Sequence, residues 1–139
     1  MVEALRERGL IERAMVSTME MHTLKRILEL EPGLRRGWTY PKTTRDWTKR
    51  IWARPVLPAA LAAMRLQLPG IAAQKLPQFG VFAMWVYHPL VTARLARICE
   101  LARVELIAWT VDEEKRMRKL VEIGVDGLVS NDPRLFQRL

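Results

Sequence analysis

The sequence predicts an α/β fold built on a parallel sheet. Five short segments have the length of strands, among them the continuous apolar run at residues 80–86, and segments with apolar residues at helical spacing lie between them. Because parallel neighbours need a crossover of about a dozen residues, this alternation favours a parallel sheet. No glycine-rich phosphate loop follows any run, which argues against a nucleotide-binding sheet, but the pattern leaves open a doubly wound sheet or part of a barrel. The expected strands are residues 14–18, 34–39, 80–86, 104–110 and 125–130.

The helix after the fourth run has the clearest boundaries. Asp112 suits its N-cap, two glutamates follow where the helix dipole favours negative charge, and Gly124 ends the helix. Asn131 and Asp132 suit the turn and N-cap of a short terminal helix. Earlier helical segments are expected before Gly9, around Leu24, Ile27 and Leu28, over the alanine-rich residues 56–68, and around Val91, Leu95, Ile98 and Ala102.

Length and composition fit one compact domain over residues 1–139. Half of the residues (50%) are hydrophobic, which is enough for a real core. The single cysteine, Cys99, lies in an apolar helical pattern and is expected to be a buried structural thiol, since it has no partner for an intrachain disulfide. No apolar run approaches the roughly 18 residues that span a bilayer, so we expect a soluble cytoplasmic protein.

Most of the net charge of +8 lies in one segment. Residues 35–54 contain seven basic residues and one acidic residue, which gives this segment a net charge of +6. Residues 40–55 are expected to form a basic, tryptophan-rich loop insertion, with Arg45, Lys49 and Arg50 as candidate anion-binding residues. Bases interleaved with tryptophans suit a phosphodiester headgroup, an anionic membrane surface or single-stranded nucleic acid, of which nucleic acid is the least expected. The structural alternative is a solvated loop whose tryptophans pack back on the fold.

Two motifs near the C-terminus carry a family resemblance. Residues 109–112 (WTVD) resemble the motif after the seventh barrel strand of glycerophosphodiester phosphodiesterases, and residues 126–133 (DGLVSNDP) resemble the eighth-strand signature of that family. The motifs stand in the family's order and are separated, as in the family, by one short helix that ends in glycine. The resemblance implies a partial TIM (β/α)8 barrel in which this chain forms strands four to eight.

The upstream match is thinner but keeps the family's order. Residues 15–18 are similar to the fourth-strand segment, although Thr18 replaces the usual phenylalanine. Residues 37–41 are similar to the fifth strand and its exit, and residues 88–92 to the segment after the sixth strand. The resemblance therefore extends over almost the whole chain.

The resemblance implies that Trp109 lines the substrate pocket, at the end of a strand. Trp38, His88 and Ser17 are the other substrate-binding candidates. The structural alternatives are a core position for Trp109 and a structural or surface position for His88. His22 lies at a helix start, where we expect capping or exposure to solvent.

The family's catalytic motifs come from the first three strands. By resemblance, these enzymes hydrolyse glycerophosphodiesters to glycerol 3-phosphate and an alcohol, with a divalent metal (Mg²⁺ or Ca²⁺) held by carboxylates and histidines acting as acid and base. The His-Arg-Gly, Glu-x-Asp and His-Asp motifs do not occur in this sequence. We therefore assign no catalytic or metal-binding residue, and we expect no metal to bind to this chain alone.

The resulting hypothesis is the C-terminal part of a glycerophosphodiester phosphodiesterase of lipid metabolism, inactive alone. An open five-stranded remnant leaves strand edges and an inner face uncovered. We therefore expect a fragment, or a chain that pairs with the missing N-terminal barrel half or with a second chain. The alternative is a non-catalytic binding module that holds anionic lipid or nucleic acid through residues 40–55.

Overall fold

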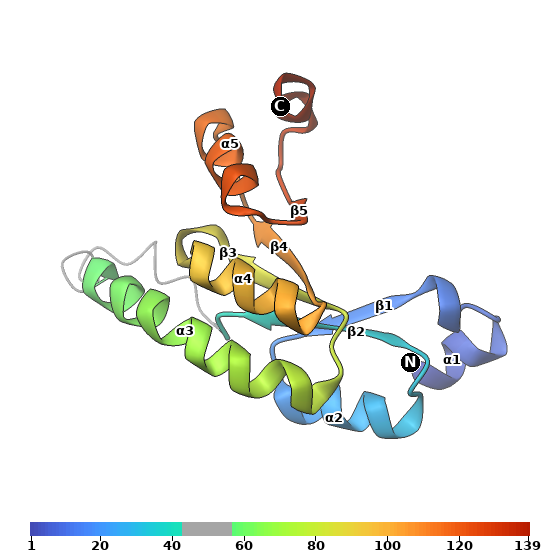
Figure 1. Ribbon diagram of the computed structural model, residues 1–139. Helices are drawn as coiled ribbons and strands as arrows, with labels where there is room; N and C mark the ends of the chain where they lie inside the picture. The colour runs from blue at the N-terminus through green and yellow to red at the C-terminus, as the bar shows by residue number, and fades with distance from the viewer. Residues whose placement is uncertain (43–56) are drawn as a thin grey trace.

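The computed structural model contains one five-stranded parallel sheet and describes residues 1–42 and 57–139 (Figure 1). The strand order is β1-β2-β3-β4-β5, and every neighbouring pair is parallel. The unbroken order favours a barrel segment, because a doubly wound sheet reverses its strand order at a switch point. The predicted alternation is confirmed. The strands are β1 (Met15–Thr18), β2 (Arg35–Tyr40), β3 (Ala83–Tyr87), β4 (Glu105–Trp109) and β5 (Gly127–Leu128).

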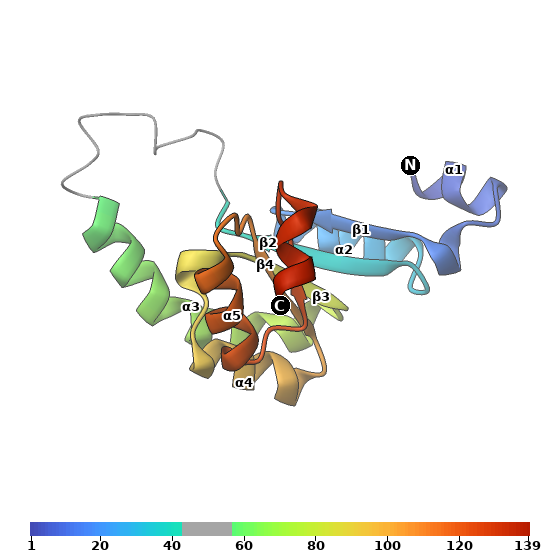
Figure 2. The ribbon, with the colours of Figure 1, turned by 90° about the horizontal axis from the view of Figure 1, so that it is seen from above.

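The connecting helices gather on one face of the sheet. Figures 1 and 2 show α2, α3 and α4 along the same side of the strands. Right-handed crossovers produce this arrangement when the strand order advances steadily in one direction. Among the described residues, no helix has both the length and the apolar character needed to cross a bilayer. The helices are α1 (Val2–Glu7), α2 (Met21–Leu30), α3 (Leu57–Phe79), α4 (Ala93–Ala102) and α5 (Glu114–Ile123), with short 3-10 helices η1 (Ile11–Arg13), η4 (His88–Leu90) and η5 (Pro133–Arg138).

The hydrophobic core lies between the sheet and these helices. Alternate residues of the central strands point into it and are fully buried, and side chains from α2, α3, α4 and α5 pack against them. Cys99 is buried in this core, as predicted, and burial raises the pKa of its thiol to about 12, so the thiol stays protonated. The core side chains with 0% exposure include Met84, Val86, Leu106 and Ala108 from the strands and Leu24, Leu68, Leu95, Met117 and Leu120 from the helices.

Helix α3 is longer than the sequence predicts. The alanine-rich pattern predicts a helix over residues 56–68, whereas α3 continues through Pro69 to Phe79. An internal proline removes a backbone hydrogen bond and costs about 3 kcal/mol. Leu68 and Leu76, on either side of Pro69, are 0% and 2% exposed, and burying a leucine contributes about 1.5–3 kcal/mol. Because Pro77 is a second internal proline, the burial of these two leucines and of Ala72 offsets much of the combined cost, which local sequence propensity alone does not reveal.

The other face of the sheet, which we call the inner face, keeps access to solvent. Side chains alternate along a strand, and parallel partners share a face. In contrast to the core rows, the large side chains of this face are only partly buried, and Ser17 and Glu105 are exposed. By strand register the inner face consists of Ser17, Gly37, Ala83 and Glu105 in one row, Thr39, Trp85, Ile107 and Gly127 in the next, and Tyr87 and Trp109 in the last.

Gly37 makes room for Trp85 on the inner face. A Cβ atom at Gly37 would lie 1.8 Å from Cζ3 of Trp85 and 2.7 Å from its Cε3. Real Cβ contacts are essentially never this short, so a side chain at position 37 must displace the indole ring. The glycine therefore determines how the tryptophan lies across β2.

Replacing Gly37 with Ala is expected to destabilise the fold by about 1–3 kcal/mol, the usual cost of overpacking, and to move the Trp85 indole. Chemical denaturation gives the free energy of unfolding, and near-ultraviolet circular dichroism reports the ring environment. Gly70→Ala in α3 is the control, because its new Cβ meets nothing within 4 Å; it is expected to be neutral or to stabilise by up to about 1 kcal/mol. Wild-type stability and an unchanged tryptophan spectrum in Gly37→Ala would contradict the proposed packing.

Candidate functional site

Three rings stand together at the C-terminal edge of the sheet. Tyr87 and Trp109 are register partners at the ends of β3 and β4, with ring centroids 5.8 Å apart. His88 follows Tyr87 directly, and their ring centroids are 5.3 Å apart in an edge arrangement. All three side chains are half-buried. We call these three residues the aromatic wall; such rings offer a ligand an apolar surface with polar edges, at the end of the sheet where barrel active sites lie.

The indole N–H of Trp109 is buried, and no residue in the described part of the chain accepts its hydrogen bond. A buried donor without an acceptor costs about 1–3 kcal/mol, so native proteins rarely leave one unpaired. Within the described residues, the aromatic wall therefore lacks a hydrogen-bond acceptor for the Trp109 indole.

The structure brings together two of the four predicted substrate-binding residues. Trp109 and His88 belong to the aromatic wall, whereas Ser17 lies exposed on the inner face of the edge strand β1. Trp38 is 5% exposed and belongs to the hydrophobic core, because its register with Met84 points it toward the helices. Trp38 and Trp109 thus occupy opposite faces of the sheet.

The predicted anion-binding residues Arg45, Lys49 and Arg50 lie outside the described residues. Binding of lipid or nucleic acid by the basic loop stays a prediction. His22 is exposed beside Glu20, with 3.7 Å between Nδ1 and the carboxylate, at the start of α2. Its position agrees with the expected helix start.

Arg116 of α5 holds His88 from the helix side. Its Nε–H donates to Nδ1 of His88 at 3.2 Å, and its Nη2 donates to the His88 carbonyl. A guanidinium can only donate, so Nδ1 must be unprotonated, and the neutral ring carries its proton on Nε2. Burial and, next, the charge of Arg116 lower the pKa of His88, while Glu113 and Asp112 oppose this shift.

Sequence reasoning missed Tyr87 and Arg116. The run at residues 80–86 was expected to be a continuous apolar strand, but residues 84–87 alternate aliphatic and aromatic side chains, and this signal could have placed Tyr87 on one face with its aromatic neighbour Trp85. Nothing comparable marks Arg116, because its contact with His88 bridges 28 positions of the sequence. Such a contact depends on how α5 packs after β4.

Asp112 ties the loops after β4 and β5 together. Its Oδ1 accepts hydrogen bonds from the Asn131 amide (2.8 Å) and the Ser130 hydroxyl (2.9 Å), and its Oδ2 accepts from Nδ2 of Asn131 (2.9 Å). The amide of Val111 also donates to the carbonyl of Val129 at 2.8 Å. The hydrogen bond from the Asn131 amide, followed by those from the side chains, lowers the pKa of the Asp112 carboxyl.

This network corrects one prediction and confirms two. Asp112 is not the N-cap of α5; Glu113 occupies that position, because the Asp112 carboxylate is engaged by the neighbouring loop. Gly124 ends α5 in the left-handed conformation, as predicted. Asp132 caps η5 through a hydrogen bond from the Arg134 amide, also as predicted.

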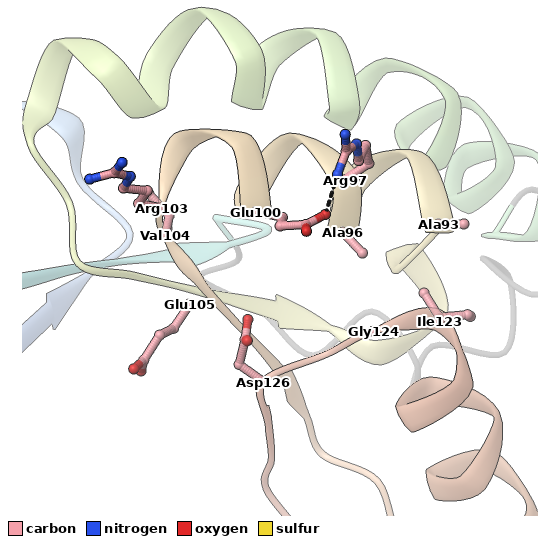
Figure 3. A pocket seen from close by; sticks show the side chains of 10 residues that line it. All are labelled: Ala93, Ala96, Arg97, Glu100, Arg103, Val104, Glu105, Ile123, Gly124 and Asp126. Carbon is pink, nitrogen blue, oxygen red and sulfur yellow. Dashed lines mark hydrogen bonds and ion pairs between the residues drawn. The ribbon is translucent and has the colours of Figure 1, made fainter.

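The motif at residues 126–133 begins at the N-terminal end of the sheet and continues to the C-terminal end. Asp126, its first residue, accepts a hydrogen bond from the Leu106 amide at 2.8 Å, near the N-terminal end of β4. A hollow of about 640 Å³ lies there, and Figure 3 shows Glu100, which pairs with Arg97 at 2.7 Å, on one side of it and Asp126 on the other. Both carboxylates already have protein partners, and this edge is opposite the aromatic wall. We therefore assign this hollow no role in the candidate site.

The described residues do not fit a divalent metal. Mg²⁺ and Ca²⁺ need several oxygen ligands that converge on one point. Residues 1–42 and 57–139 contain no group of three or more His, Cys, Asp or Glu side chains with that arrangement.

Replacing Asp112 with Ala is expected to speed hydrogen exchange at the Asn131 amide, because its acceptor is lost. The folded-state pKa of Asp112 lies below its ordinary value of 3.8, so the stabilisation is complete well above pH 3.8 and is lost as the pH falls through the folded-state pKa. An NMR titration should show the Asn131 amide resonance following that protonation. Glu122→Ala, on the exposed surface of α5, is the control. An unchanged rate of hydrogen exchange at the Asn131 amide in Asp112→Ala would contradict the proposed link between the two loops.

Curated relatives of the chain are glycerophosphodiester phosphodiesterases. An Arabidopsis thaliana protein, glycerophosphodiester phosphodiesterase GDPD4, is 40% identical over 60 residues, which is 43% of this chain and 18% of that protein. A glycerophosphodiester phosphodiesterase of Caldanaerobacter subterraneus subsp. tengcongensis is 21% identical over 140 residues, covering 100% of this chain and 47% of that protein. The chain thus spans less than half the length of both relatives.

Solved structures show the same fold. A glycerophosphodiester phosphodiesterase from Parabacteroides distasonis superposes with a TM-score of 0.69 at 15% identity, over 99% of this chain and 47% of that one. An Oleispira antarctica phosphodiesterase, solved in complex with the product sn-glycerol-3-phosphate, superposes with a TM-score of 0.61 at 15% identity, over 89% of this chain and 40% of that one. The sequence matches the glycerophosphoryl diester phosphodiesterase family over residues 1–135, and the chain belongs to that family.

Proposed function

We propose that this chain supplies the substrate-lining half of a glycerophosphodiester phosphodiesterase barrel and is inactive without the half that carries the catalytic groups. The complete barrel would hydrolyse a glycerophosphodiester of lipid metabolism to glycerol 3-phosphate and an alcohol. The observation that carries the proposal is the aromatic wall at the C-terminal edge, combined with an inner face that the described residues leave open.

The partial exposure of the inner face supports the proposal that further strands cover it in the complete barrel. Trp85, Ile107 and Trp109 are large apolar side chains there, and each retains solvent exposure while the core rows of the same strands have none. Within the described part of the chain, the edge strands β1 and β5 have one strand neighbour each. In a closed barrel additional strands would pair with both edges and bury the apolar rows. Those strands would come from the N-terminal half, on the same chain or on a second one.

The substrate class rests on the family and on one relative. The Oleispira antarctica phosphodiesterase binds the product sn-glycerol-3-phosphate. In the present chain the aromatic wall occupies the edge at which barrel enzymes bind substrate, and its half-buried rings suit the carbon skeleton of a glycerol moiety. The wall would position the substrate and exclude water. It has no carboxylate set for a metal, so no metal-dependent step is assigned to it.

Activity is expected only when the barrel is completed. The chain would be mixed with a polypeptide that carries the first three strands of a full-length family barrel, and release of glycerol 3-phosphate from glycerophosphocholine would be measured with Mg²⁺ or Ca²⁺ present. Release is expected from the mixture and from neither component alone. Metal-dependent release by the 139-residue chain alone would show that it carries catalytic groups of its own.

Ile107→Arg tests whether the inner face is the surface that is covered. A guanidinium on this face must be desolvated when the two halves join, which costs several kcal/mol and should abolish the complementation. Val121→Arg is the matched control, because Val121 is 54% exposed on α5 and the change adds the same charge. Equal complementation by both variants would argue against the inner face as the joining surface.

A further inference from the structure

The aromatic wall contains a hydrogen-bond donor, the His88 ring, whose orientation is fixed by hydrogen bonds from Arg116. His88 is half-buried and lies immediately after β3, at the C-terminal edge. Its Nδ1 is occupied by the Nε–H of Arg116 at 3.2 Å, and its carbonyl by Nη2 of the same guanidinium. Two hydrogen bonds from one planar group hold both the backbone and the ring of a single residue. Only Nε2 of the imidazole is left without a partner among the described residues.

Arg116 brings a positive charge into direct contact with His88. The side-chain hydrogen bonds of Arg116 within the described part of the chain go to the ring and the carbonyl of His88. Arg65, from α3, lies close enough to lower the pKa of Arg116, after the larger effect of burial. The two acids near His88 are Glu113 and Asp112, and the Asp112 carboxylate is already engaged by Asn131. Arg116 is therefore the cation that contacts the histidine, and Arg65 adds positive charge near Arg116.

We propose that His88 and Arg116 form a phosphate-recognition element, in which the Nε2–H of neutral His88 donates to a phosphoryl oxygen of the ligand and Arg116 acts as the positioning residue. The inference rests on the proposed function for the identity of the ligand, a phosphodiester. The proposed phosphate-binding residues, His88 and Arg116, lie outside the motifs at residues 109–112 and 126–133. The neutral ring suits this role because it donates a hydrogen bond without the cost of burying a second positive charge beside Arg116.

The tautomer is tested first, in the isolated 139-residue chain. Nitrogen-15 NMR of the imidazole is expected to show the Nε2-protonated form at neutral pH, with a His88 pKa below 6.5. Arg116→Ala should raise that pKa toward 6.5 and release the tautomer preference. Arg118→Ala, two residues away on α5 and paired with Glu114, is the matched control and should change neither. A protonated Nδ1 in the wild type, or an unchanged pKa in Arg116→Ala, would overturn the positioning role.

The ligand class is tested by titrating the same chain with inorganic phosphate, sn-glycerol 3-phosphate and glycerol. The His88 ring resonances are expected to move with the two phosphates and to remain unchanged with glycerol. The response should be lost in Arg116→Ala and retained in Arg118→Ala. Movement with glycerol alone would assign His88 to a hydroxyl group and overturn phosphate recognition, as would no movement with any of the three compounds.

The completed barrel separates this inference from the proposed function. His88→Ala is expected to raise KM for glycerophosphocholine by about ten- to hundredfold with little change in kcat, the effect of losing one hydrogen bond to a charged ligand. His88→Gln, which retains an N–H donor, should recover part of the loss. A wild-type KM in His88→Ala would overturn the phosphate element and leave the proposed function intact. A completed barrel without activity would instead contradict the proposed function, and the NMR titrations would then decide the phosphate element independently.

Discussion

The structure depends on side-chain burial in the central strands, which is complete on the helix-covered face of the sheet and partial for the large side chains of the other face. Met84, Val86, Leu106 and Ala108 are fully buried against the helices, whereas the residues between them face an open inner surface. Because β-strand side chains alternate, each strand belongs at once to the core that stabilises this chain and to a second layer that the described residues do not complete. This division explains how the chain has a well-packed core and still belongs to a family whose curated relatives here are more than twice its length.

The two ends of the sheet also differ. At the N-terminal end, Arg36 is 7% exposed and donates to the carbonyls of Pro32, Leu34 and Gly80, and Asp126 accepts from the Leu106 amide. These bonds join neighbouring connections. The C-terminal end has the aromatic wall and the Arg116 guanidinium. The hydrogen bonds of Arg36 and Asp126 and the aromatic wall thus occupy opposite ends of the sheet.

The family motifs have a structural explanation in this arrangement. The Asp112 carboxylate, at the end of the WTVD motif, binds Ser130 and Asn131 of the second motif. Trp109, at the start of the same motif, is placed in the wall by its register with Tyr87. One motif residue therefore joins two loops, and another supplies a ring to the candidate site. The tie between the loops holds β5, which has only two residues, against its neighbour β4.

The sequence by itself determined the strand and helix alternation, the parallel sheet, the family and the position of Trp109 at a strand end, because these follow from local periodicity and short motifs. Tertiary structure alone decided three other features. Helix α3 continues past Pro69 because its core contacts outweigh a local penalty, Trp38 turns to the core because of strand register, and Arg116 reaches His88 across 28 positions. Each of these depends on contacts between residues distant in sequence, whose energies no local pattern contains.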